Sequence, residues 1–211
     1  MKVIEIEQGS EDWKRLREGR LTGTKIGKIF AKSRNSEELF DTTKPLLGFY
    51  ELLAERLTDS DDLGSTIERG HELEAEALAK ASEELGIEFV HGNVWELDEN
   101  HIESPDGYTE DLTEAIEIKC LSSARHIMAI YTNQYPQEYM SEYVNYFIVN
   151  DKLKRLFVYL YDARFIEPRY RSAVWVIERG DIEAYIERMK QVKEEALEQV
   201  EQAIKEMEQR Q

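Results

Sequence analysis

Hydrophobic residues along this chain recur with two periods, which predicts both helices and strands. Spacings of three and four residues predict helices over about 67–85, 137–149 and 181–209, and the aromatic residues of the second are expected to be core. Short apolar runs predict strands at 87–90, 93–97, 115–120, 156–161 and 172–177. This order of elements favours an α/β protein with a mixed sheet.

The N-terminal part of the chain is predicted to hold a short edge strand over 3–7 and helices over 11–18, over 25–31 and from residue 43 onward. Ser10 can cap the first of these helices, because its hydroxyl can accept a hydrogen bond from a free N–H of the first turn. Pro45 suits the first turn of the third helix, and apolar residues then follow at helical spacing.

Length and composition indicate one folded domain, 1–211. Of the 211 residues, 41% are hydrophobic and three are tryptophan, which supports a sizeable core. The single cysteine, Cys120, excludes an internal disulfide framework and a cysteine-cluster metal site. No apolar run approaches the roughly 20 residues of a membrane span, and the N-terminus does not resemble a signal peptide. We therefore expect no membrane partner and a cytoplasmic location.

The charge is unevenly distributed. The net charge of −17 argues at first against nucleic acid. However, residues 14–34 hold eight basic residues and one acid, whereas residues 51–117 hold 21 acids and three bases. A basic N-terminal segment can contact phosphates while the acidic remainder repels DNA. Ordinary surface lysines and arginines are the alternative interpretation of this segment.

One stretch carries candidate chemistry. Pro105, Asp106 and Gly107 predict a turn, and the strand at 115–120 places Glu117 and Lys119 on one face. Two carboxylates and a lysine can therefore converge, and oxygen ligands of this kind suit Mg²⁺ or Mn²⁺. A cation beside a lysine is suited to attack on a phosphodiester. The pattern alone is weak, because a solvated strand face after a surface turn often carries Glu and Lys.

Longer blocks of sequence carry a resemblance. Ser104-Pro105-Asp106-Gly107 followed by Glu117-Ile118-Lys119 resembles the core motif of the phage lambda exonuclease (YqaJ-like viral recombinase) branch of the PD-(D/E)XK nucleases. Further matching blocks run from Gln8 to Arg17, from Leu21 to Thr24 and from Arg69 to Glu74. The resemblance spans nearly the whole chain. It implies a restriction-endonuclease-like core, with a central mixed β-sheet flanked by α-helices.

The resemblance also implies roles for particular residues. Asp106, Glu117 and the Ile118 carbonyl would bind one or two Mg²⁺, or Mn²⁺, with Glu74 completing the second site. Lys119 would position or activate the attacking water. Glu142 stands where the family has the Gln of a Gln-x-x-x-Tyr motif, and a carboxylate there would repel phosphate unless it binds metal. The residues expected to hold the DNA backbone are Arg17, Thr24 and Arg34, the last at a terminal 5′-phosphate.

The function implied is a Mg²⁺-dependent exonuclease, encoded by a bacterial host or a prophage, that degrades the 5′-ended strand of linear double-stranded DNA. It would release 5′-phosphomonoester products and leave 3′ overhangs for recombination by strand annealing. Relatives form a ring-shaped homotrimer and work with a phage single-strand annealing protein. Two alternatives stay open: a structure-specific or restriction-type endonuclease on the same core, and a nuclease-fold protein that only binds DNA or a recombination partner.

Overall fold

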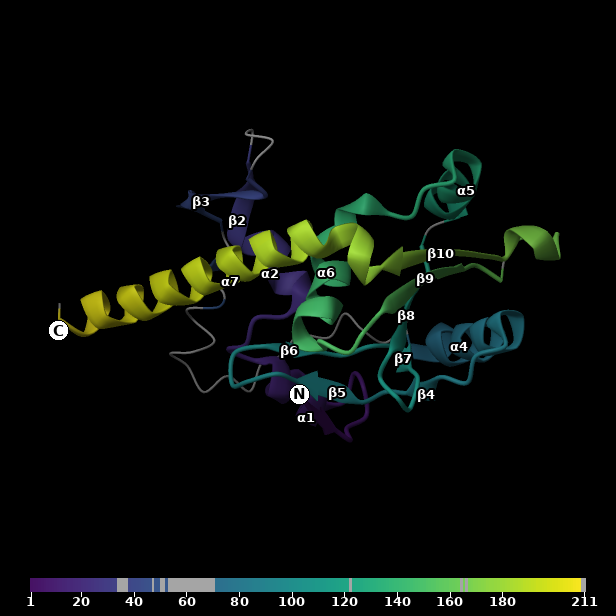
Figure 1. The fold of residues 1–211 in the computed structure, drawn as a ribbon, viewed down its shortest axis with the longest axis horizontal. Coiled ribbons are helices and arrows are strands. Elements are labelled where there is room, and N and C mark those ends of the chain that lie inside the picture. The colour runs from purple at the N-terminus through teal and green to yellow at the C-terminus, as the bar shows by residue number, and fades with distance from the viewer. Residues whose placement is uncertain are drawn as a thin grey trace.

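The computed structural model of this chain describes residues 1–33, 38–46, 48–49, 52, 71–121, 123–163, 165 and 167–209. In this part of the chain the largest sheet has the strand order β10-β9-β8-β7-β4 (Figure 1). Its strands are β4 (Val90–His91), β7 (Gly107–Tyr108), β8 (Glu114–Lys119), β9 (Arg155–Tyr161) and β10 (Ser172–Glu178). None of the described helices is long and apolar enough to cross a membrane.

Strand β8 lies in the middle of this sheet and gives it its mixed character. It pairs antiparallel with β7, where Gly107 lies opposite Ile116, and parallel with β9, where Glu117 lies opposite Val158. Its four central residues are buried, as expected for a strand that is covered on both faces. The predicted mixed sheet is confirmed.

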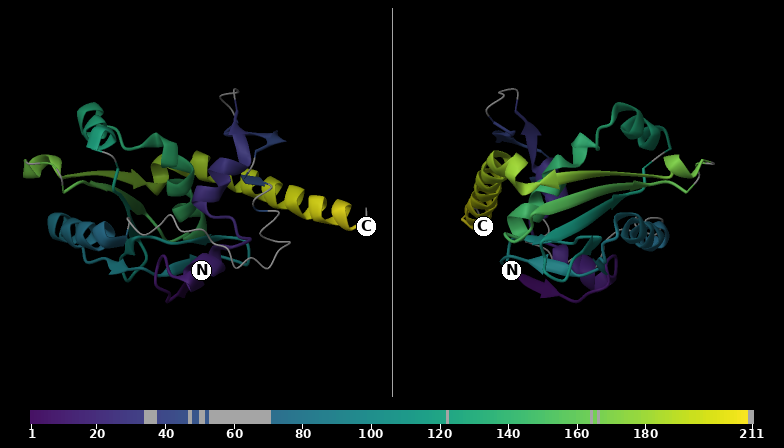
Figure 2. Two further views of the ribbon diagram at one scale, coloured as in Figure 1. Left: turned by 180° about the vertical axis from the view of Figure 1, so that it is seen from behind. Right: turned by 45° about the vertical axis from the view of Figure 1, so that its right-hand side comes forward.

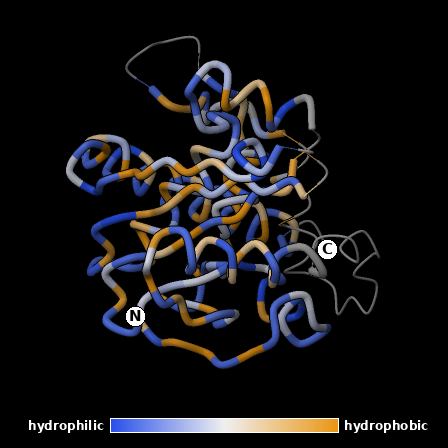
Figure 3. Tube along the Cα trace, turned by 90° about the vertical axis from the view of Figure 1, so that its right-hand side faces the viewer, coloured by the Kyte–Doolittle hydropathy of each residue, from blue (hydrophilic) through white to orange (hydrophobic). Residues whose placement is uncertain are grey.

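Helices cover both faces of the sheet (Figure 2). On one face, α4 (His71–Leu85) packs Ala77 and Leu78 against the isoleucines of β8. On the other face, α6 (Met140–Val149) and the long α7 (Arg179–Glu208) pack against Ala115 and Val158. Hydrophobic stretches run along the strands that cross the middle of the molecule (Figure 3). Two apolar clusters thus hold β8 in place, one on each side.

The remaining described elements surround this core. They are a three-stranded sheet of β1 (Lys2–Ile4), β5 (Val94–Glu96) and β6 (Ile102–Glu103), a hairpin of β2 (Phe30–Lys32) and β3 (Phe40–Pro45), the helices α1 (Glu11–Arg17), α2 (Gly23–Ile29) and α5 (Ser123–Thr132), and the 3₁₀ turns η1 (Gln137–Tyr139) and η2 (Pro168–Tyr170). Strand β1 lies at an edge, as predicted. Ser10 caps α1 by accepting from the Trp13 N–H at 3.1 Å.

The predicted start of a helix at residue 43 was wrong, since helix is found only later, at the described residues Gly48, Phe49 and Leu52. Residues 40–45 form β3, which pairs antiparallel with β2 across a bulge at Phe30 and Ala31. Thr42 and Thr43 favour a strand because they are branched at Cβ, and Pro45 is tolerated because it ends the strand. For the same reason α2 ends at Ile29 and not at Ala31, since Phe30 already belongs to the hairpin.

Gly23 lets α2 approach α6 closely. A Cβ at this position would lie 2.6 Å from the Glu142 Cα and 2.8 Å from the Asn145 Cβ, closer than atoms can pack. Gly23→Ala is therefore expected to lower the free energy of unfolding by about 2 kcal/mol, measured by urea denaturation. The matched control is Gly180→Ala in α7, where a Cβ meets nothing within 4 Å. That change should leave stability equal or slightly higher, and equal losses in both variants would contradict the packing argument.

Candidate active site

The three residues of the predicted core motif converge in the structure. Asp106 follows β6 in a turn, and its Oδ2 accepts a hydrogen bond from the backbone N–H of Ile118 at 2.7 Å. Glu117 and Lys119 lie on the same face of β8, with Lys119 Nζ 2.5 Å from Glu117 Oε1. Asp106 and Glu117 are each 5% exposed. The period of two along a strand, used in the prediction, accounts for this arrangement.

Burial and neighbouring charges shift the pKa values of the three motif residues. Burial, and next the charge of Glu74, raise the pKa of Asp106 to about 7. Burial, and next the charge of Asp106, raise the pKa of Glu117 well above its ordinary value. For Lys119, burial lowers the pKa, but the charges of Glu117 and Glu142 outweigh it and raise the pKa above that of a free lysine. The site therefore holds more negative charge than Lys119 offsets.

The donor atoms here fit a hard divalent cation. Among the described residues, no three His, Cys, Asp or Glu side chains already stand in metal-binding geometry. The acids instead hold protein donors: Gln8 Nε2 lies 3.2 Å from Asp106 Oδ1, and the Tyr146 hydroxyl donates to Glu117 Oε2. The pKa values of Asp106 and Glu117 are nevertheless raised, in part by neighbouring carboxylates, and a bound divalent cation would supply the positive charge that stabilises their ionised forms.

Two helices supply the other predicted acids. Glu74 lies in α4, partly buried, close enough for its charge to raise the pKa of Asp106. Glu142 lies in α6, and its Oε1 is 3.1 Å from Lys119 Nζ. The ammonium group of Lys119 also lies 4.5 Å from the centre of the Tyr139 ring. The lysine is thus held between Glu117, Glu142 and an aromatic face.

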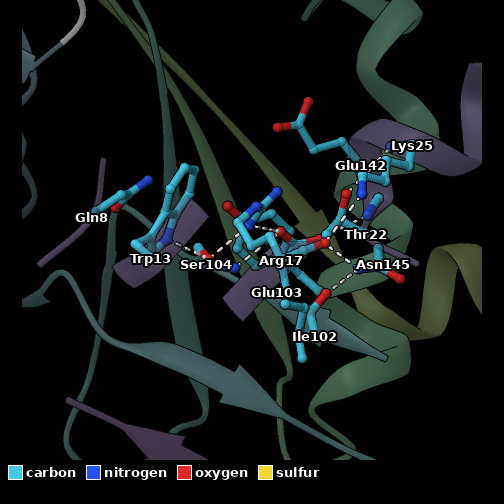
Figure 4. A network of polar contacts seen from close by, with 12 residues as sticks. Gln8, Trp13, Arg17, Thr22, Lys25, Ile102, Glu103, Ser104, Glu142 and Asn145 are labelled. Carbon is cyan, nitrogen blue, oxygen red and sulfur yellow. Dashed lines mark hydrogen bonds and ion pairs between the residues drawn. The ribbon is translucent and has the colours of Figure 1, made fainter. Parts of the chain in front are cut away.

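The predicted DNA-contacting residues differ in how firmly the structure places them. Arg17 donates to Ser104 Oγ at 2.7 Å and lies 4.5 Å from the centre of the Trp13 ring (Figure 4). Ser104 precedes Asp106 by two residues in the sequence. Thr24 is exposed in the first turn of α2, next to the close contact with α6. Arg34 lies outside the described residues.

Some contacts of the site could not be read from periodicity. Tyr146 belongs to the aromatic stripe expected to be core, and only the resemblance marks it, as the Tyr of the Gln-x-x-x-Tyr motif; it is buried, and its hydroxyl reaches Glu117. Gln8 lies in the N-terminal block of the resemblance without a role assigned to it, and it contacts Asp106. Trp13 Nε1 donates to Ser104 Oγ at 2.9 Å, which ties α1 to the motif turn. Helical spacing alone cannot distinguish such a polar tip from an ordinary core residue.

Comparison with known proteins decides the family. The YqaJ-like viral recombinase domain matches residues 12–152, which include Arg17, Glu74 and the motif residues from Asp106 to Glu142. The chain belongs to this family. No curated protein sequence matches this YqaJ-like chain significantly.

Solved structures resemble the YqaJ-like chain in fold. An alkaline exonuclease (LHK-Exo) from Laribacter hongkongensis matches with a TM-score of 0.79 and 24% identity, over 95% of this chain and 97% of that one. The same enzyme in complex with dAMP matches equally well. A phage-related exonuclease from Haemophilus somnus 129PT matches with a TM-score of 0.64 and 16% identity, over 89% of this chain and 96% of that one. The nuclease fold expected from the sequence is confirmed.

Proposed function

We propose that this YqaJ-like domain is a Mg²⁺-dependent exonuclease that degrades the 5′-ended strand of linear duplex DNA. One observation carries the proposal: Asp106, Glu117 and Lys119 meet in one buried site, with Glu74 and Glu142 reaching it from two helices. Membership of a recombinase family and a fold shared with two exonucleases support it. Mononucleotides with a 5′-phosphate and a 3′ single-stranded overhang are the products we propose.

The mechanism assigns a task to each group of the site. Asp106, Glu117 and the Ile118 carbonyl are the atoms that would hold Mg²⁺, with Glu74 at a second position. When bound, the metal would neutralise the scissile phosphate and acidify the attacking water. Lys119 keeps its proton, since its pKa is raised, and can donate a hydrogen bond to that water or to a phosphate oxygen. Tyr146 orients Glu117 by its hydrogen bond.

DNA binding is assigned to the basic N-terminal segment. Arg17 is anchored beside the motif turn by Ser104, and a guanidinium can bind a phosphate through two parallel hydrogen bonds. Thr24 presents a hydroxyl on the exposed start of α2. We further propose Arg34 as a contact of the 5′-phosphate, a homotrimeric ring as the assembly and a single-strand annealing protein as the partner. These three proposals rest on the resemblance.

Substitutions of Glu142 test whether this position needs a carboxylate, since the resemblance places a Gln here in relatives. Glu142→Gln keeps a carbonyl oxygen to accept from Lys119, so cleavage is expected to stay within about threefold of the wild type. Glu142→Leu removes the acceptor 3.1 Å from Nζ and is expected to slow cleavage by about tenfold or more. Initial rates on linear duplex DNA measure both. If Gln and Leu impair cleavage equally, the carboxylate itself acts in catalysis or metal binding.

Substrate topology tests the proposed function. The purified protein is incubated with Mg²⁺ and a linear duplex labelled at either the 5′ or the 3′ ends, and in parallel with covalently closed plasmid. We expect early release of the 5′ label as mononucleotide, slow release of the 3′ label, intact plasmid, and no reaction in EDTA. Nicked plasmid would instead indicate an endonuclease. Binding without any cleavage would indicate a DNA-binding protein on a nuclease fold.

A further inference from the structure

Glu103 is a buried acid that the proposed mechanism does not use. It is the last residue of β6, is 2% exposed and immediately precedes Ser104 of the motif turn. Four donors surround its carboxylate, namely Asn145 Nδ2 at 2.5 Å, the Ser104 N–H at 3.0 Å, the Gly23 N–H at 3.3 Å and the Arg17 guanidinium at 3.9 Å (Figure 4). The Glu103 carboxylate therefore joins several segments of the chain through a buried polar network, which we call the Glu103 junction.

The four donors come from four different parts of the fold. Arg17 ends α1, Gly23 begins α2, Asn145 lies in α6 and Ser104 leads to Asp106. Two of these elements carry the proposed DNA contacts, and the other two carry Asp106 and Glu142. Glu103 therefore lies where the DNA-contacting elements meet the catalytic ones.

Only a carboxylate can satisfy this set of donors. Oε2 accepts from Gly23 and Asn145, while Oε1 accepts from Ser104 and faces Arg17. An ionised carboxylate accepts at both oxygens, whereas the amide of a glutamine would turn an N–H group toward one pair of donors. The oxygen of such an amide would stay with Gly23 and Asn145, because Asn145 Nδ2 makes the shortest of these contacts, at 2.5 Å. Its N–H group would then oppose the Ser104 N–H and Arg17.

A hydrogen bond from Lys193 fixes the orientation of the Asn145 amide. Lys193 in α7 is 1% exposed, and its Nζ lies 2.5 Å from Asn145 Oδ1. The ammonium form of Lys193 only donates, so the Asn145 oxygen faces Lys193 and its amide N–H faces Glu103. The same N–H group also lies 3.2 Å from the Ile102 carbonyl. The long helix α7 thus holds Asn145, which in turn holds one oxygen of Glu103.

We propose that Glu103 is a positioning residue that holds Arg17 and the start of α2 in a fixed relation to the catalytic acids. It acts through Arg17 and does not itself contact DNA, since it is almost fully buried. The effect on turnover rests on the proposed function, whereas the placement of Arg17 does not. Glu103→Gln is expected to raise KM for linear duplex DNA by about tenfold or more, because Arg17 loses its anionic partner and faces an N–H group.

A double-mutant cycle tests whether Glu103 acts through Arg17. The wild type, Glu103→Gln, Arg17→Ala and the double variant are compared by kcat and KM. We expect Arg17→Ala to raise KM for linear duplex DNA strongly in the wild type, and by less than about threefold in the Glu103→Gln background. The control is Glu96→Gln in the neighbouring strand β5, which breaks an ion pair of 2.8 Å between Glu96 and Arg20 that does not involve Arg17. It should leave the effect of Arg17→Ala unchanged. Effects of Glu103→Gln and Arg17→Ala that simply multiply would overturn the proposal.

A spectroscopic measurement separates this proposal from the proposed function. Arg17 lies over the ring of Trp13, and the chain has only two other tryptophans. With 5-fluorotryptophan and ¹⁹F NMR, Glu103→Gln is expected to shift the Trp13 resonance, as Arg17→Ala does. The resonance of Trp175, which donates to Asn133 in another part of the fold, should stay in place.

The two outcomes of this measurement are distinct. A Trp13 resonance that does not move in Glu103→Gln would overturn the positioning role even if the protein is an active nuclease. A protein that shows the shift and cleaves no DNA would overturn the proposed function and leave the placement of Arg17 by Glu103 supported.

Discussion

Replacing Lys119 by alanine is expected to lower the rate of DNA cleavage by about a thousandfold or more, while affinity for duplex DNA changes by less than about threefold. The reason is its position: Nζ lies 2.5 Å from Glu117 and 3.1 Å from Glu142 at the centre of the buried acids. From this position the ammonium group can donate to the attacking water or to a phosphate oxygen. Single-turnover cleavage with Mg²⁺ measures the rate, and fluorescence anisotropy with Ca²⁺ measures binding.

Lys80→Ala provides the matched control for this result. Lys80 is also ion-paired with a glutamate, Glu83 at 2.8 Å, but lies on the exposed side of α4. Its loss should leave both cleavage and binding unchanged. Normal cleavage by Lys119→Ala would refute the assignment, and a parallel loss of DNA binding would show that Lys119 serves binding and not the chemical step.

Replacing Asp106 by asparagine is expected to have two opposite effects. Cleavage should fall by about a thousandfold or more, because the carboxylate proposed to bind metal is lost. The metal-free protein should at the same time become more stable at pH 8, by up to about 4 kcal/mol. The geometry permits the change: Asn can still accept from the Ile118 N–H, and the Gln8 amide can rotate to present its oxygen.

The pH dependence of this gain follows from the sign of the pKa shift. Asp106 has a pKa of about 7 in the folded protein and 3.8 in the unfolded chain, so the folded state binds a proton that the unfolded state has lost between these values. Wild-type stability therefore falls as the pH rises from about 4 to 7, and Asp106→Asn lacks this loss. The gain should be small near pH 4 and reach its full size at pH 8.

Urea denaturation in EDTA at pH 4, 6 and 8 measures the gain. Asp111→Asn is the control, because hydrogen bonds from Thr109 and Thr113 lower the pKa of this exposed acid. Its replacement should give no gain at pH 8. A gain for Asp106→Asn that is equal at all three pH values would show that the asparagine packs better, and that the charge of Asp106 costs the fold nothing.

The parts of the site that could be predicted from sequence are those set by local geometry. The convergence of Glu117 and Lys119 follows from alternation along one strand, and the turn at Asp106 follows from Pro105 and Gly107. Glu142 could be placed near Lys119 only through the resemblance, because α6 reaches β8 by tertiary packing. Contacts within one strand could thus be predicted from periodicity, whereas contacts between different elements could be predicted only from the resemblance.

Other parts of the structure were not predictable, for physical reasons. The helix expected from residue 43 starts later than predicted, because pairing with β2 holds residues 40–45 in the strand β3 and helix is found only at the described residues 48, 49 and 52. The junction of Glu103, Asn145 and Lys193 joins residues far apart in the chain. Nothing local distinguishes Lys193 from the surface lysines of α7, yet it is buried, and burial lowers its pKa to about 7.

Metal binding by the two buried acids tests the central claim most directly. Mn²⁺ is titrated into the wild-type protein, Asp106→Asn and Glu117→Gln, and free Mn²⁺ is followed by electron paramagnetic resonance. The account predicts one or two Mn²⁺ bound per wild-type chain, with binding lost or at least about tenfold weaker in both variants. A wild-type protein that binds no Mn²⁺, or variants that bind it as tightly as the wild type, would contradict the shared cation site.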